Sequence, residues 1–128
     1  MSPARTRAAA ALGTPLPPSS TDVAFHRWLP APGIDYAVVY LRFRLGRAEG
    51  LAFRDRLELR TGDDATARVY LGTGWHLAPE GAPAWWPADP AATLTEQAAR
   101  ATDTGGWIVA GYSAPYWYLL VNETRAQD

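Results

Sequence analysis

Six tryptophans lie in a chain of 128 residues, and each of them must find a place in the fold. Trp has a large apolar side chain with an N–H that needs a partner, so an indole either anchors a core or presents an aromatic platform. Trp85 and Trp86 are adjacent, with prolines at positions 83, 87 and 90 around them. These prolines predict a loop, and a loop does not easily bury two neighbouring indoles in one direction. Either the pair is exposed for binding, or the loop folds back and one Trp covers the core.

Composition excludes several classes of protein. The formal net charge of −1 gives no electrostatic case for nucleic acid or a membrane as partner. The chain has no cysteine, which excludes disulfides and thiolate metal sites. All twelve basic residues are Arg, a bias typical of a GC-rich bacterial genome. No stretch is long and apolar enough to span a bilayer, so we expect a soluble chain, cytoplasmic by default and exported if a signal precedes the printed start.

The pattern along the chain predicts three regions. Residues 1–20 are rich in Ala, Pro, Ser and Arg and predict a flexible N-terminal arm, residues 21–122 a single globular domain, and residues 123–128 a frayed end. Residues 36–45 form the clearest strand, with apolar side chains on one face and Tyr40, Arg42 and Arg44 on a face expected to be wet.

The remaining segments predict an α+β fold. Strands are expected at 23–28 and 67–71, and the chain closes with a hairpin of 107–112 and 116–121. Residues 47–59 alternate like a strand but have helical composition, and helix is favoured. Asp89 and Pro90 predict the start of a further helix, with a thin apolar stripe continuing to position 101. We therefore expect an antiparallel sheet of four to five strands with one or two helices packed on one face.

Catalytic and metal-binding patterns are weak. His26 and His76 have no spacing typical of metal ligands, so neither a metal site nor a cofactor is expected. Ser113, His76 and Asp103 could form a hydrolase-like site on paper. The sequence around Ser113 has Pro115 where a nucleophile elbow needs Gly, and a hairpin is not a strand-to-helix turn. Catalytic residues are therefore not assigned, and a small hydrolase remains only an alternative.

The arginines offer a second alternative. Arg42 and Arg44 project from one strand face beside Tyr40, and such a face can hold a phosphate or stack a base. Acidic residues in the same third of the chain largely cancel this charge. An anionic ligand or a nucleic acid is therefore the alternative to binding through the tryptophans.

Four segments together resemble a small bacterial domain. They are residues 16–23 (LPPSSTDV), 40–43 (YLRF) and 84–87 (AWWP), followed by the closing aromatic hairpin, and the resemblance covers residues 16–121. Such domains are mostly uncharacterised and often occur in exported or lipid-anchored proteins. The resemblance implies an α+β arrangement of sheet and helix without known catalytic residues. This chain departs from it by lacking the lipid-bearing cysteine and an export signal.

These observations favour a non-catalytic interaction or ligand-binding module. Trp85 and Trp86 are the main candidates to contact the ligand, with Trp75 and Trp117 as further candidates. Exposed indoles stack on sugar rings, on proline-rich peptides or on a partner protein surface. The expected partner is therefore a protein, peptide or glycan.

Overall fold

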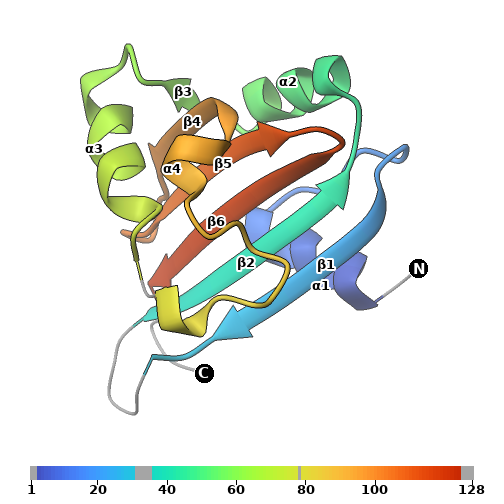
Figure 1. Cartoon of the computed structure of the whole chain (residues 1–128), viewed down its shortest axis with the longest axis horizontal. Helices are drawn as coiled ribbons and strands as arrows, with labels where there is room; N and C mark the ends of the chain where they lie inside the picture. The colour runs from blue at the N-terminus through green and yellow to red at the C-terminus, as the bar shows by residue number, and fades with distance from the viewer. Residues whose placement is uncertain (1–2, 31–35, 78, 125–128) are drawn as a thin grey trace.

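The computed structural model describes residues 3–30, 36–77 and 79–124 and shows an α+β fold built on one open antiparallel sheet. The sheet has six strands in the order β1-β2-β6-β5-β4-β3 (Figure 1). In chain order the elements are α1 (Pro3–Leu12), β1 (Thr21–Trp28), β2 (Tyr36–Arg44), α2 (Arg47–Arg56), β3 (Arg60–Thr61), α3 (Ala65–Gly74), the 3-10 helix η1 (Pro79–Gly81), α4 (Pro90–Thr93), β4 (Thr95–Ala101), β5 (Trp107–Ser113) and β6 (Tyr116–Thr124).

Both faces of the sheet are covered, and the strands β2, β5 and β6 have buried apolar side chains on both sides. On the first face, the helices α1 and α2 pack through Ala8, Leu12 and Phe53 onto the row of β2 that includes Leu41 and Phe43. On the second face, α3, α4 and the loop of residues 77–90 pack onto a core with Val38, Tyr40, Ala99, Val109 and Leu120. Figure 1 shows α3, α4 and this loop in front of the sheet and α1 behind it.

Several predicted elements are confirmed. The strand at 23–28 is β1, the strand at 36–45 is β2, and the closing hairpin is β5 and β6. The ambiguous segment 47–59 is largely helical as α2, so helical composition outweighed its alternation. Asp89 caps α4, where its side chain accepts a hydrogen bond from the Ala92 N–H, and Pro90 is the first helical residue.

Two elements were predicted with the wrong type, and the two errors cancel in the strand count. The sheet has six strands rather than four or five because it also contains the two-residue β3, which was not predicted. Residues 67–71 belong to α3 rather than to a strand, because the Asp64 side chain accepts hydrogen bonds from the N–H groups of Thr66 and Ala67 and starts a helix there. The helix predicted from Pro90 ends at Thr93, and residues 95–101 form β4. The small side chains of Ala98 and Ala99 pack into opposite cores, as strand alternation requires.

Two further predictions about the layers were wrong. Helices pack on both faces of the sheet rather than on one, and the face of β2 with Tyr40 is buried rather than wet. The expected flexible arm contains α1, whose Ala8 and Leu12 are buried against the sheet. At the other end β6 continues to Thr124, and the rest of the predicted frayed end, residues 125–128, lies outside the described residues.

Gly50 tests the packing of α2, because a Cβ at this position would lie 1.9 Å from Nε1 of Trp117. Gly50→Ala is expected to lower the free energy of unfolding by at least about 2 kcal/mol, since a buried indole in a packed core cannot move aside cheaply. Chemical denaturation followed by circular dichroism measures the change.

Gly72→Ala is the matched control, because Gly72 is also in a helix but has open space where a Cβ would be added. Here the helix propensity of Ala should raise stability by about 0.5–1 kcal/mol. Equal effects at Gly50 and Gly72 would contradict the close approach of α2 to Trp117.

Candidate functional site

The loop of residues 77–90 crosses the second face of the sheet and brings the Trp pair to it. The described part of the loop after position 78 begins with η1. The last residue of η1, Gly81, lies so close to Trp28 that a Cβ at this position would be 2.2 Å from the indole. The absence of a side chain at Gly81 therefore lets the loop backbone rest on Trp28 of β1. At the other end, the start of α4 at Pro90 fixes where the loop rejoins the sheet.

Trp86 is the centre of an aromatic cluster on this face. Its ring lies 5.0 Å from that of Tyr40 and 5.8 Å from that of Tyr118, both in edge-to-face geometry. Its ring is also 6.1 Å from Trp75 and 6.2 Å from Trp85. Edge-to-face contacts of this kind stabilise a packed core beyond the area that they bury. Trp86 thus joins the loop to β2, to β6 and to the end of α3.

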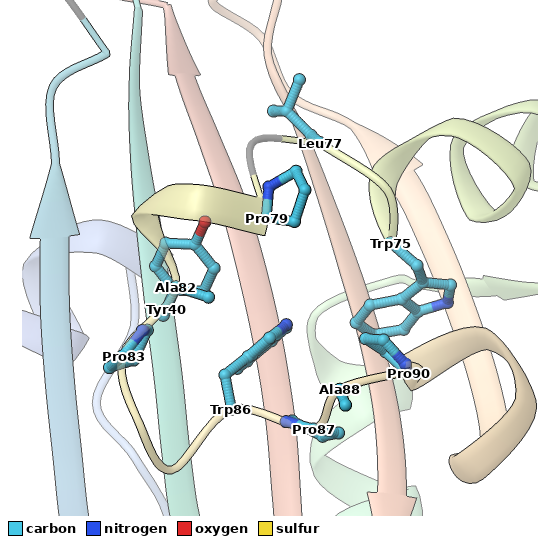
Figure 2. A pocket seen from close by; sticks show the side chains of 10 residues that line it. All are labelled: Tyr40, Trp75, Leu77, Pro79, Ala82, Pro83, Trp86, Pro87, Ala88 and Pro90. Carbon is cyan, nitrogen blue, oxygen red and sulfur yellow. The ribbon is translucent and has the colours of Figure 1, made fainter.

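A pocket of about 240 Å³ remains between the loop and the sheet. Figure 2 shows Trp86 reaching from the loop into the space bordered by Tyr40 of β2 and by Trp75 at the end of α3. Aromatic rings, prolines and small apolar side chains line the pocket: Tyr40, Trp75, Leu77, Pro79, Ala82, Pro83, Trp86, Pro87, Ala88 and Pro90. The walls therefore offer ring faces together with polar atoms, which suits a ring-shaped ligand that also forms hydrogen bonds.

A second layer of hydrogen bonds holds the Trp75 wall. The indole N–H of Trp75 donates to Oε1 of Gln97 at 3.0 Å, and only 4% of Trp75 is exposed. The Gln97 amide in turn donates to the carbonyl oxygens of Leu94 and Ala91 at 2.7 and 3.0 Å. Because Gln97 is fixed at both ends, the orientation of Trp75 is fixed before any ligand arrives.

Tyr40 supplies the titratable side chain of the pocket wall. Burial raises its pKa to about 12, and the negative charge of Glu80 acts in the same direction. The hydroxyl consequently stays protonated at neutral pH, so it can form hydrogen bonds but does not act as a base.

The structure separates the four tryptophans that the sequence singled out. Trp75 and Trp86 line the pocket, and Trp85 lies beside it in contact with Trp86. Trp117 is 2% exposed in the core of the opposite face, so it lies outside this cluster. Both members of the Trp85–Trp86 pair are half-buried against the second core, which corresponds to the interpretation of the loop as a cover.

Arg42 forms a second feature at the edge of the cluster. The central carbon of its guanidinium is 5.3 Å from the Trp85 ring and 4.4 Å from the Tyr116 ring. Nη2 of Arg42 lies 3.9 Å from a carboxylate oxygen of Asp22, and the same oxygen accepts a 2.5 Å hydrogen bond from the Tyr116 hydroxyl. Among the described residues, no partner accepts a hydrogen bond from the buried Nε of Arg42. Arg44 follows on the same strand face and is exposed.

Tyr116 and Tyr118 were not predicted as part of the site. Strand alternation could have found them, since they share one face of β6 and pair in register with Arg44 and Arg42. Gln97 carried no such signal, because its segment was predicted as helix.

The hydrolase alternative is not supported by the placement of its residues. Asp103 precedes β5 and Ser113 ends it, so the strand separates them by about 20 Å at 3.3 Å per residue. His76 is exposed just after α3, and the other histidine, His26, packs 5.9 Å from the Tyr40 ring. Within the described parts of the chain, no three acidic or histidine side chains gather as a metal site would require.

Comparisons with known protein families, with curated proteins and with solved structures give no match for this chain. The resemblance of residues 16–121 to small bacterial domains therefore stays a prediction. In the described portion of the structure, no helix is long and apolar enough to cross a membrane.

Trp86→Ala should destabilise the protein more than Trp85→Ala. Trp86 loses contacts with four rings, and we expect a loss of about 3 kcal/mol for truncating this large packed side chain. Trp85 loses one ring contact and its contact with Arg42, a loss of about 1 kcal/mol. Urea denaturation of both variants measures the difference, and the reverse order would contradict the central position of Trp86.

The raised pKa of Tyr40 predicts a loss of stability in alkali. The unfolded chain ionises this tyrosine near pH 10 and the folded protein near pH 12, so the unfolded state gives up its proton first and gains stability as the pH rises through this range. Tyr40→Phe should therefore show a smaller fall in unfolding free energy between pH 10 and 12 than the natural chain. Denaturation at several alkaline pH values tests this, and parallel curves for both proteins would be the contrary result.

Proposed function

We propose that this chain is a non-catalytic binding domain whose ligand occupies the pocket between Tyr40, Trp75 and Trp86. The observation that carries the proposal is the pocket itself, which aromatic rings and prolines surround on a rigid sheet. Binding sites for small molecules are typically concave and largely apolar, with a few polar groups that fix the orientation of the ligand.

The size of the pocket limits the ligand to a compact molecule. An apolar protein cavity of about 150 Å³ is sufficient to hold benzene. The pocket of about 240 Å³ thus has room for a molecule of one or two rings. Ring faces of Trp and Tyr attract such molecules through stacking and edge contacts.

The chemistry of the walls supports binding rather than catalysis. Among the lining residues, Tyr40 is the titratable side chain, and its pKa of about 12 keeps it neutral at physiological pH. A general base works best when its pKa is near the working pH, and the pKa of Tyr40 lies far above physiological pH. The walls instead offer the faces and edges of aromatic rings to a ligand.

A pocket-filling substitution tests the proposal. Ala82 lines the pocket, so Ala82→Leu should occupy the space without removing an aromatic ring. Phenol, indole and methyl β-glucoside serve as probes in saturation-transfer NMR on the full chain, and we expect the two aromatic probes to bind. Ala82→Leu should weaken their binding by about tenfold or more, because ligand and side chain would compete for one volume.

Ala84→Leu is the matched control, since Ala84 is an exposed residue of the same loop and does not line the pocket. It should bind the probes like the natural chain. Absence of binding by all three probes, or equal loss in both variants, would refute the proposed pocket. Binding of the glucoside alone would assign the pocket to sugars rather than to aromatic molecules.

A further inference from the structure

We propose that Arg42, held against Trp85 and Tyr116, is a separate binding site for the carboxylate or phosphate group of a small ligand. Arg42 is absent from the residues that line the pocket, so this site and the proposed pocket can succeed or fail independently.

The aromatic contacts fix the guanidinium in place. Arg42 lies 4.4 Å from the ring of Tyr116 and 5.3 Å from the ring of Trp85, so it is attracted to two π systems at once. These contacts restrict the motion of a long side chain, which reduces the entropy lost when a ligand binds. A fixed guanidinium fork matches the two oxygens of a carboxylate or phosphate.

The donors of Arg42 are poorly used within the protein. Its Nε is buried and, among the described residues, has no hydrogen-bond acceptor. The contact of Nη2 with Asp22 is 3.9 Å, longer than a hydrogen bond. The side chain is 20% exposed, which leaves a direction of approach from solvent. Because Nε is buried, an oxyanion from solvent would accept from the Nη groups, and it would gain hydrogen bonds that the protein does not already make.

The charge around this site favours an anion. Arg42 and the exposed Arg44 point to the same face of β2, and Asp22 is the carboxylate that contacts Arg42. Asp22 is also engaged by the Tyr116 hydroxyl at 2.5 Å, so part of its capacity as an acceptor is already used. The three side chains sum to one positive charge, and Asp22 competes with any incoming anion.

Arginine side-chain NMR on the full chain tests the site. The ¹⁵N–¹H signal of Arg42 Nε, identified by its loss in Arg42→Lys, is followed during titration with sodium phosphate and, separately, with sodium acetate. Sodium chloride keeps the ionic strength constant, because exposed charges are screened by salt. We expect a saturable shift with at least one anion, and the stronger of the two assigns phosphate or carboxylate as the preferred group.

The Nε signal of Arg54 is an internal control in the same spectra. This nitrogen is also buried without a described partner, but the Arg54 side chain donates to the carbonyl of Glu96, away from the proposed site. It should not move. If neither anion gives a saturable shift at Arg42, or if both arginine signals shift together, the proposal is wrong.

Two variants distinguish a specific anion site from nonspecific electrostatic attraction. Asp22→Asn keeps an acceptor for Tyr116 but removes the competing charge, and should tighten binding by about fivefold, the factor for one unit charge at about 4 Å in water. Arg42→Lys keeps the charge but loses the fork, and should weaken thermal stabilisation by the preferred anion by about tenfold in apparent affinity. Circular dichroism checks that it folds, and if it does not, the Asp22→Asn result decides. Unchanged affinity in Asp22→Asn would overturn the proposal.

Discussion

The docking of Trp86 onto the sheet is the interaction on which the second face of this protein depends. On that face α3 contacts β4 and β5, so the side chains of β2 and β6 need another cover. The loop of residues 77–90 supplies this cover, and Trp86 contacts both strands through Tyr40 and Tyr118. Buried strands with apolar side chains on both faces are unstable without such a layer. A loop can replace a helix here because a single indole buries as much area as several smaller side chains.

The same loop creates two neighbouring environments. Trp86 lines a pocket bordered by aromatic rings and prolines, whereas its neighbour Trp85 contacts the guanidinium of Arg42. In an irregular loop, the side chains of adjacent residues do not have to point in opposite directions as they do in a strand. Trp85 and Trp86 can therefore contact different neighbours on the same face of the sheet. Two neighbouring indoles can thus both be accommodated in a small chain. Both are half-buried, and each has its own set of partners.

The sequence was sufficient to predict the elements whose local and tertiary preferences agree. β2 and the β5–β6 hairpin have β-branched and aromatic residues in alternation, and both formed as expected. α3 and β4 were missed because another interaction overrode composition in each, a local helix cap in α3 and strand pairing in β4. Capping by Asp64 turned a strand-like segment into a helix, and pairing with β5 turned an alanine-rich segment into a strand. For the site, Trp75 and Trp86 were named from the sequence, whereas Tyr40 was named only for the anionic-ligand alternative. Trp117 was not separable from the other tryptophans without the register that places it opposite Phe43.

Two β-bulges place acidic side chains in positions that secondary-structure propensities do not predict. The pairing of β1 shifts between Thr21 and Ala24, and that of β4 shifts between Thr95 and Ala98. Each bulge contains an acidic residue with positive φ, Asp22 at 51° and Glu96 at 55°. A bulge re-aims a side chain relative to the regular pleat. Glu96 accepts a 2.6 Å hydrogen bond from Arg47 at the start of α2, so this bulge ties the helix to the sheet. Asp22 instead reaches Tyr116 and Arg42, so the other bulge places a negative charge beside the guanidinium that lies against Tyr116 and Trp85.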